Sequence, residues 1–230
     1  MAKRIVFLMS DTGGGHRAAA EAIRDALIER YGRDKIEASM VDVYKNMSFP
    51  ANTMPEFYPW IVNHGKMLWT LAYRWGNMPM NANLTNRMTY RWNGAKLRRM
   101  ARQNMGDVIV CVHSVTGAPA MSAYLALPER PPFVTVVTDL VSTPIYWYDP
   151  RVDRCLVPTQ AAYDRGVNYG MKPEKMRVTG LPVHPNFNRA LSEKNAARTE
   201  LGWDANLPTV LMIAGGDGMG PLYETARAIV

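Results

Sequence analysis

Short strand-like runs alternate with helix-like patterns over most of the chain, and this alternation restricts the possible fold more than any other feature. The first run is 4–10 (RIVFLMS), and small apolar residues at 19–27 then form one face of a helix. Further strand-like runs lie at 36–43, 107–113, 133–139, 154–158 and 176–180, with helix-like patterns at 119–127 and 159–169. Strands that alternate with helices build parallel sheets covered by helices. We therefore predict an α/β fold with a doubly wound parallel sheet.

Residues 44–105 interrupt this alternation with a segment rich in Trp, Met and Pro. Between residues 57 and 106 there are eight Lys and Arg and no acidic residue, so this stretch carries +8 while the whole chain carries +7. A helical insertion packed on the core would explain the aromatic residues and methionines. An anionic lipid surface would explain them together with the charge, because ordinary solvated faces mix both signs. The predicted lipid-contacting residues are Trp60, Trp69, Trp75, Arg91, Trp92, Arg98, Arg99 and Arg102.

Three consecutive glycines, Gly13, Gly14 and Gly15, lie between the first strand and the first helix. A glycine turn that opens a helix is a common anion-binding device, because the unpaired N–H groups of the helix face the ligand. A P-loop would need Lys-Ser or Lys-Thr next, and His16-Arg17 excludes it. The dinucleotide fingerprint fits weakly with Ala18 as its last position and Asp42 as the ribose-binding acid. An NAD(P)-dependent oxidoreductase therefore remains an alternative.

His16 follows the glycines directly, at the carboxyl end of the first strand. Ligands bind at this edge of open α/β sheets, and an imidazole there can act as a general base near neutral pH. A histidine that only caps or packs is the other possibility.

The last part of the chain begins a second unit. A polar connector at 186–202 precedes a strand-like run at 209–214, a second glycine-rich stretch at 215–220 and a helix starting near Leu222. We predict two domains, 1–185 and an incomplete one at 186–230, and expect the chain to be a fragment of a longer protein.

Several functional classes receive no support from the sequence. No run is long enough to span a membrane and no signal peptide is evident, which favours a cytoplasmic protein. Cys111 and Cys155 lie in apolar runs and are expected to be buried thiols. No metal-ligand cluster and no nucleic-acid-binding motif is present, so we predict neither a metal nor a nucleic-acid partner.

An ordered set of motifs resembles one enzyme family along nearly the whole chain. SDTGGGHRAAAEAI at 10–23 is followed by VDVY at 41–44, VH at 112–113, VVTDL at 136–140, WYDPRVDRC at 147–155, VTGLPV at 178–183 and GGDGMGPL at 215–222. This set is similar to the monogalactosyldiacylglycerol synthases and the related bacterial processive diacylglycerol glycosyltransferases. That family has a GT-B architecture of two Rossmann-like domains, is related to the lipid II-forming N-acetylglucosaminyltransferase, and transfers sugar with inversion.

The resemblance implies a role for each motif. His16 would be the base, with Asp139 as a second candidate, and Gly13, Gly14, Gly15 and His113 would face the acceptor. A UDP-sugar would bind at Gly215, Gly216, Gly218, Met219 and Gly220, and the insertion would dock on a membrane. The chain departs from the family at Pro144, Ile145 and Tyr146, where relatives often carry a His, and at His184, where we expect Arg.

Together these observations predict the acceptor half of a membrane-associated glycosyltransferase. The full enzyme would transfer a hexose from a UDP-sugar to diacylglycerol, with no cofactor besides that co-substrate. We expect a peripheral protein on the inner face of the cell membrane. The alternatives are the oxidoreductase and a non-catalytic module that binds anionic lipid.

Overall fold

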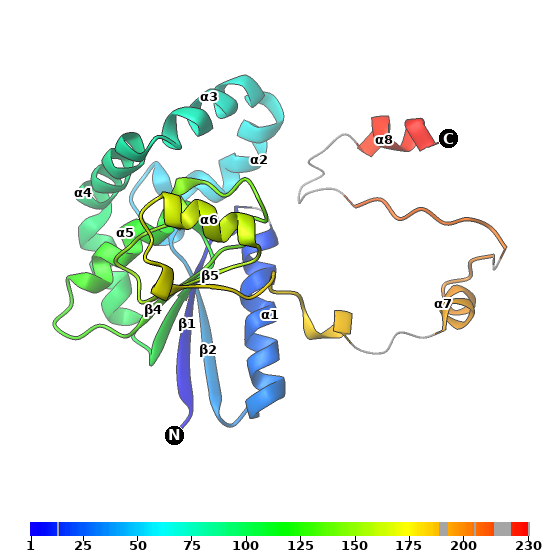
Figure 1. The fold of residues 1–230 in the computed structure, drawn as a ribbon, viewed down its shortest axis with the longest axis horizontal. Coiled ribbons are helices and arrows are strands. Elements are labelled where there is room, and N and C mark those ends of the chain that lie inside the picture. The colour runs from blue at the N-terminus through cyan, green and yellow to red at the C-terminus, as the bar shows by residue number, and fades with distance from the viewer. Residues whose placement is uncertain (13, 189–192, 205, 214–221, 230) are drawn as a thin grey trace.

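A six-stranded sheet forms the centre of the molecule in the computed structural model, which describes residues 1–12, 14–188, 193–204, 206–213 and 222–229 (Figure 1). All neighbouring strands are parallel, in the order β2-β1-β3-β4-β5-β6. The strands are β1 (Lys3–Met9), β2 (Ile36–Asp42), β3 (Val108–Cys111), β4 (Phe133–Val136), β5 (Arg154–Val157) and β6 (Met176–Val178). The predicted parallel sheet is confirmed.

Helices cover both faces of the sheet, as a doubly wound fold requires. The crossover from β1 to β2 through α1 (Gly14–Tyr31) runs toward one edge, and the crossovers through α5 (Ser114–Leu125) and α6 (Gln160–Asn168) run toward the other. Because such crossovers are right-handed, α1 lies on the face opposite α5 and α6. One buried cluster accordingly contains Phe7 and Ala20, and a larger one contains Leu97, Met121 and Trp147.

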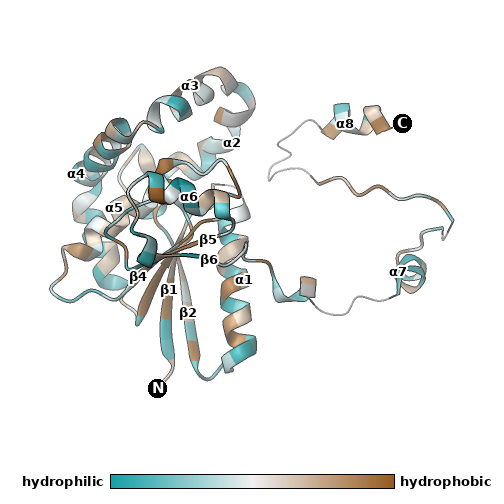
Figure 2. Ribbon diagram, viewed as in Figure 1, coloured by the Kyte–Doolittle hydropathy of each residue, from teal (hydrophilic) through white to brown (hydrophobic). Residues whose placement is uncertain are grey.

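The segment between β2 and β3 is helical, as predicted. Two short 3-10 turns (Tyr44–Asn46 and Ala51–Thr53) lead into α2 (Met54–His64), α3 (Lys66–Gly76) and α4 (Pro79–Gln103). Leu97, Met100 and Ala101 of α4 are fully buried in the larger core cluster, which anchors the segment to the sheet. In Figure 2 the α4 ribbon carries both brown and teal residues, so apolar and polar side chains are mixed along it. No helix among the described residues has the length and apolar character needed to cross a bilayer.

Two local predictions differ from the structure or fall partly outside it. Gly14 and Gly15 form the first turn of α1 rather than a loop, and Gly13 lies outside the described residues. The predicted strand at 209–214 is wrong over 209–213, which contains no strand and has exposed apolar side chains. A single strand without a neighbour to pair with has little stability in water, and no strand lies beside this one in the described part of the chain.

The rest of the C-terminal part is mostly short helices. A 3-10 turn (Pro185–Asn188) and α7 (Lys194–Glu200) form the predicted connector, and α8 (Leu222–Ile229) follows. The predicted nucleotide-sugar residues Gly215, Gly216, Gly218, Met219 and Gly220 lie outside the described residues.

Both cysteines are free and buried, as predicted. Burial raises the pKa of the Cys111 thiol and of the Cys155 thiol to about 12. Both therefore remain protonated at neutral pH and serve packing.

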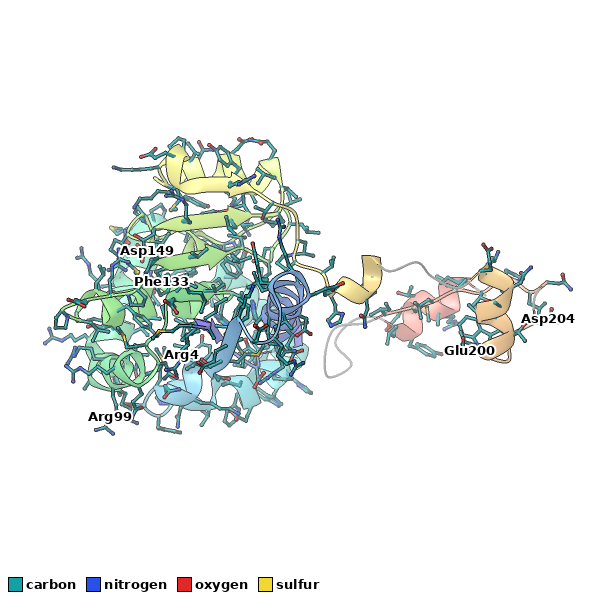
Figure 3. The ribbon with its side chains drawn as sticks, turned by 90° about the horizontal axis from the view of Figure 1, so that it is seen from below. Arg4, Arg99, Phe133, Asp149, Glu200 and Asp204 are labelled. Carbon is teal, nitrogen blue, oxygen red and sulfur yellow. The ribbon has the colours of Figure 1, made fainter. Side chains whose placement is uncertain are left out.

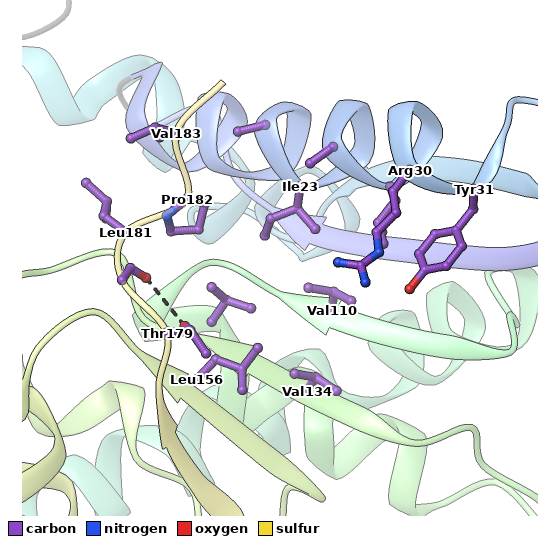
Figure 4. A pocket seen from close by; sticks show the side chains of 15 residues that line it. Ile23, Arg30, Tyr31, Val110, Val134, Leu156, Thr179, Leu181, Pro182 and Val183 are labelled. Carbon is purple, nitrogen blue, oxygen red and sulfur yellow. Dashed lines mark hydrogen bonds between the residues drawn. The ribbon is translucent and has the colours of Figure 1, made fainter. Parts of the chain in front are cut away.

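A largely apolar cavity of about 420 Å³ lies between α1 and the sheet face of β3, β4 and β5 (Figure 4). Ile23 of α1 and Val110, Val134 and Leu156 of the strands line it, with Arg30 at one end. None of the residues predicted to carry out the chemistry lines this cavity.

Candidate functional site

Three predicted site residues lie beyond the carboxyl ends of adjacent strands. His16 lies in the first turn of α1 just after β1, His113 follows β3, and Asp139 follows β4. Because β1, β3 and β4 are neighbours, their carboxyl ends share one edge of the sheet. The His16 and His113 ring centroids are 4.4 Å apart, and the charge of Asp139 acts on His16. The structure therefore assembles a cluster that the sequence could only suggest.

The hydrogen bond of His16 fixes which of its ring nitrogens can accept a proton. Nδ1 lies 2.7 Å from the backbone carbonyl oxygen of Val112. A carbonyl oxygen only accepts, so Nδ1 carries the hydrogen and Nε2 of the neutral ring keeps a free lone pair. Burial lowers the pKa of His16, although the Val112 bond and Asp139 oppose that shift. The neutral form with a basic Nε2 is thus favoured at neutral pH.

His113 is buried under His16 and holds two neighbouring segments. Its Nδ1 accepts the backbone N–H of Thr116 at the start of α5 at 3.4 Å, which leaves Nε2–H to donate to the Thr12 hydroxyl oxygen at 3.1 Å. Burial, helped by the adjacent His16, holds the pKa of His113 well below its usual range. His113 is therefore a neutral support for the loop before α1, with 4% of its surface exposed.

Asp139 is held by a tryptophan. The indole Nε1–H of Trp147 donates to Asp139 Oδ2 at 2.7 Å, and the Trp147 ring centroid lies 6.1 Å from that of His16. Trp147 itself is only 1% exposed. One carboxylate oxygen is thus fixed by a rigid buried donor, and the orientation of Asp139 depends on where Trp147 lies.

Two tyrosines from the segment after β2 complete the surroundings of the cluster. The Tyr44 ring meets His113 edge-on at 5.6 Å, and burial raises the pKa of its phenol. Burial and the charge of Asp139 raise the pKa of Tyr58 on α2. The helical insertion therefore forms one wall of the site.

The glycines at the start of α1 border open space. A Cβ added to Gly14 or Gly15 would meet no atom within 4 Å, so packing among the described residues does not demand glycine at either position. Close approach of a ligand to the backbone is the usual reason for such glycines.

Asp42 binds backbone N–H groups of the protein, which does not agree with its role in the oxidoreductase alternative. Its carboxylate accepts the backbone N–H groups of Asp11 and Lys45, each at 3.1 Å, and so joins the segments after β1 and β2. Asp11 in turn binds the Arg17 guanidinium through two 2.8 Å hydrogen bonds, which lower the pKa of the Asp11 carboxyl. A ribose-binding acid would instead direct its oxygens toward the ligand.

The insertion exposes its aromatic and cationic side chains. Trp60, Trp75 and Trp92 are 61%, 53% and 72% exposed. Trp69 belongs to α3, and its side chain lies outside the described part of the structure. Arg91, Arg99 and Arg102 are exposed on α4, with Arg99 at the edge of the molecule in Figure 3, while Arg98 is half-buried and donates to the Tyr90 hydroxyl at 3.3 Å. Exposed apolar side chains also include Phe49, Phe57, Met67, Leu71, Met78, Met80, Leu84 and Met88.

His184 lies away from the cluster. Its Nε2 is 3.1 Å from Asp25 Oδ2 on α1, and its Nδ1 accepts the backbone N–H of Asn186. Among the described residues, no three His, Cys, Asp or Glu side chains are grouped as a metal site would require.

Sequence analysis missed Trp147, Thr12 and Tyr58 as members of the site. Trp147 belongs to the motif at 147–155, but the sequence analysis gave it no role. Its residue type was the only indication of a role, because a buried indole N–H needs a hydrogen-bond acceptor. Thr12 and Tyr58 meet their partners through the tertiary fold, so local sequence carried no signal for them.

Comparison with known proteins supports the resemblance seen in the sequence. The family model of monogalactosyldiacylglycerol (MGDG) synthase matches residues 16–183. The monogalactosyldiacylglycerol synthase of Spinacia oleracea is 38% identical over 99% of this chain and 44% of its own length. Monogalactosyldiacylglycerol synthase 1 of Arabidopsis thaliana is 35% identical over 99% of this chain and 43% of its own. The chain thus spans less than half the length of these relatives.

Solved structures offer only distant likenesses. The apo form of the lipopolysaccharide outer core galactosyltransferase WaaB has a TM-score of 0.44 at 12% identity, covering 78% of this chain and 46% of its own. Anabaena HepE in complex with UDP-glucose has a TM-score of 0.46 at 14% identity, covering 87% and 50%. Both TM-scores are below 0.5, so the family assignment rests on the sequence relatives.

Proposed function

The chain belongs to the monogalactosyldiacylglycerol synthase family, and from that premise we propose that it is the acceptor half of a glycosyltransferase that makes a galactolipid. In the proposed reaction, a UDP-hexose gives its sugar to the free hydroxyl of diacylglycerol with inversion. Residues 1–185 form the acceptor domain in this proposal, and 186–230 begin the donor domain.

His16 is the proposed general base. Its Nε2 receives the proton of the diacylglycerol hydroxyl while that oxygen bonds to C1 of the hexose. The bond between C1 and the diphosphate oxygen breaks, and its electron pair leaves with UDP. The Val112 carbonyl and the Asp139 charge then stabilise the imidazolium, because both favour protonated His16. The Nδ1–Val112 hydrogen bond is the observation that carries this assignment, since it leaves Nε2 free to act.

Asp139 is the alternative base, and its contact with Trp147 bears on that choice. One of its carboxylate oxygens already accepts the Trp147 indole N–H and is therefore not available to receive the proton of the acceptor hydroxyl. We therefore assign to Asp139 the support of the imidazolium, and to Gly14 and Gly15 close approach of the acceptor.

The donor site is proposed to involve the second glycine-rich stretch, 215–220. Backbone N–H groups at a helix start suit the diphosphate of a UDP-sugar, and α8 begins at Leu222 directly after it. No metal or other cofactor is included in this proposal.

The insertion is proposed to dock on an anionic membrane, at the inner face of the cell membrane. Its Lys and Arg residues carry +8 between residues 57 and 106 without a compensating acid. Exposed tryptophans and methionines lie among them on α2, α3 and α4. Cationic side chains contribute long-range attraction to anionic lipid, and inserted apolar side chains add a contribution that salt does not screen. Diacylglycerol is confined to membranes, so such docking would bring the acceptor to the site.

Two other functions agree less well with these observations. The family assignment and the occupied carboxylate of Asp42 both weigh against the oxidoreductase. A non-catalytic lipid-binding module would use the insertion but would leave the tautomer and surroundings of His16 without a purpose.

A transfer assay tests the proposal. Protein made from the whole coding sequence is incubated with diacylglycerol in phosphatidylglycerol vesicles and with UDP-galactose or UDP-glucose in parallel. We expect galactosyl-diacylglycerol and free UDP, with a β-linkage in proton NMR because the donor linkage is α. Absence of a glycolipid with either donor would contradict the transferase, and an α-linked product would contradict inversion.

A further inference from the structure

The C-terminal end of α3 is hydrogen-bonded to the segment that follows Asp139. Ile145 donates its backbone N–H to Asn77 Oδ1 at 2.9 Å, and Tyr73 donates its hydroxyl to the carbonyl oxygen of Ser142 at 3.1 Å. Residues 139–147 are otherwise a connection between β4 and β5 with only one short turn of helix, Ile145–Trp147. The insertion therefore supplies hydrogen-bond partners to a loop that carries part of the candidate site.

Both the oxygen and the nitrogen of the Asn77 side-chain amide make hydrogen bonds. Its Nδ2 donates to the carbonyl oxygen of Tyr73 at 3.1 Å, which orients the amide so that Oδ1 faces Ile145. Gly76, next to it, is buried against Tyr146, where a Cβ would lie 2.8 Å from the hydroxyl oxygen. Gly76 and Asn77 thus contact the same three-residue turn, Gly76 at Tyr146 and Asn77 at Ile145.

This turn ends at Trp147, whose indole fixes Asp139. Ile145 and Trp147 are the first and last residues of one 3-10 turn. Trp147 donates to Asp139 Oδ2 at 2.7 Å and lies beside His16. A displacement of Ile145 therefore moves the donor that orients Asp139.

The other side of α3 faces outward. Met67, Leu71 and Trp75 are exposed. Leu140 and Val141, which directly follow Asp139 in the chain, are exposed too. The surface proposed to dock on lipid thus includes residues next in the chain to those that join α3 to the loop after Asp139.

We propose that Asn77 is a positioning residue that couples the seating of α3 on an anionic bilayer to the Trp147–Asp139 pair beside His16. The bilayer part rests on the proposed function of the insertion. Docking orders α3, and the hydrogen bond between Asn77 and Ile145 then orders the turn that contains Ile145. The Trp147 indole N–H is consequently held more firmly on Asp139.

The test follows the Trp147 indole N–H by NMR in 15N-labelled protein, assigned with Trp147→Phe, and amide exchange across 140–148. Without lipid, Asn77→Ala should shift the indole signal and reduce protection of the Ile145 amide by about tenfold, the worth of one hydrogen bond. Asn77→Asp keeps an acceptor for the Ile145 N–H but loses the Nδ2 donor to Tyr73, so it should restore the protection only in part. Asn81→Ala is the matched control, because it also removes an asparagine hydrogen bond to the end of α3, the one from Asn81 Nδ2 to the Trp75 carbonyl oxygen at 2.9 Å.

The second part adds vesicles of equal parts phosphatidylglycerol and phosphatidylcholine. Wild type and Asn81→Ala should gain protection over 140–148, whereas Asn77→Ala should bind the vesicles and gain little. An unchanged indole signal in Asn77→Ala without lipid would overturn the positioning role. Equal gains in Asn77→Ala and wild type would overturn the coupling, as would vesicle binding by the wild type without any gain. Failure of the wild type to bind vesicles would refute the docking proposal and the coupling with it, while the lipid-free signal still decides the positioning role.

Gly76→Ala gives an independent check that leaves Asn77 in place. The added methyl should displace the Tyr146 hydroxyl and shift the indole signal, and Tyr146→Phe in the same chain should reverse that shift because it removes the clashing atom. A signal that moves in neither Asn77→Ala nor Gly76→Ala would overturn the proposal.

Discussion

The sheet and the helical insertion use the same kinds of apolar residue in opposite ways. Trp147 beside the sheet is 1% exposed, whereas Trp92 on α4 is 72% exposed. Burial of apolar surface is the main contribution that stabilises a fold, so residues such as Trp147 explain why the domain is stable. A group of exposed aromatic residues explains nothing about stability and indicates a surface for a partner. The difference suggests that chemistry resides at the sheet edge and membrane contact in the insertion.

The sharpest separation of the two regions is expected in turnover. In protein made from the whole coding sequence, His16→Ala should reduce kcat by on the order of 10²–10⁴, the usual contribution of a general base. His16→Asn should lose as much, because it can still donate to Val112 but has no Nε2. His64→Ala, an exposed change on α2, serves as the control and should retain turnover. Full activity in both His16 variants would remove His16 from the mechanism.

Stability should divide the two regions in the same way. Trp147→Ala removes a buried indole and should lower the free energy of unfolding by about 3–5 kcal/mol. Trp92→Ala removes an exposed one and should change it by less than about 0.5 kcal/mol. Urea denaturation followed by far-UV circular dichroism measures both. A large loss in Trp92→Ala would show that the insertion packs its aromatic residues within the protein.

Much of this division was visible in the sequence before the structure. The alternation of strand-like and helix-like patterns predicted all six strands, because periodicity and β-branched runs are local signals. The run without acidic residues predicted a distinct insertion, and His16 and Asp139 were placed at the correct edge of the sheet. Local signals also misled, since the run at 209–213 is typical of a strand but pairs with no strand among the described residues.

The remainder of the site depends on pairs that lie far apart in the chain. Trp147 meets Asp139 within one loop, but Thr12 meets His113 across 101 residues and Asn77 meets Ile145 across 68. Nothing in the local sequence of Asn77 marks it as a partner of the loop that carries Asp139. Such contacts follow from where the insertion packs, which only the assembled fold determines.

The buried histidines give the sheet region a pH response. The pKa of His113 is well below its usual range in the folded protein, so the unfolded chain takes up a proton first as pH falls below about 6.5. The free energy of unfolding should therefore be fully retained above that pH and fall below it by about 1.4 kcal/mol per pH unit for one such group, until the folded pKa is reached.

Urea denaturation between pH 7.5 and pH 5 measures this slope. His113→Gln removes the titrating ring and should flatten the curve, even though it also lowers stability at every pH by disturbing the Thr12 and Thr116 contacts. A variant with the wild-type slope would show that His113 does not contribute to the acid response.

The insertion's charges should have smaller individual effects that act only on lipid binding. Each Lys or Arg near an anionic surface contributes about 1 kcal/mol. Replacing Arg91, Arg99 and Arg102 with Ser should therefore weaken binding to phosphatidylglycerol vesicles while leaving the free energy of unfolding nearly unchanged. Arg30→Ser, Arg33→Ser and Lys35→Ser, which remove the same number of positive charges outside the insertion, are the control changes. Equal losses in the two sets would mean that overall charge, and not this surface, attracts the membrane.

Vesicle flotation across a salt series tests the division between the regions most directly. If the insertion is the lipid surface, the wild-type chain should float with phosphatidylglycerol vesicles far more than with phosphatidylcholine vesicles. Its binding should weaken as salt rises, because salt screens the attraction between the Lys and Arg side chains and the anionic lipid. Part of the binding should persist at high salt through the inserted apolar side chains. Trp60→Ala with Trp92→Ala should then remove the salt-resistant part. Equal flotation with neutral and anionic vesicles, or flotation with neither, would contradict the account and return the exposed aromatic residues of the insertion to an unexplained surface.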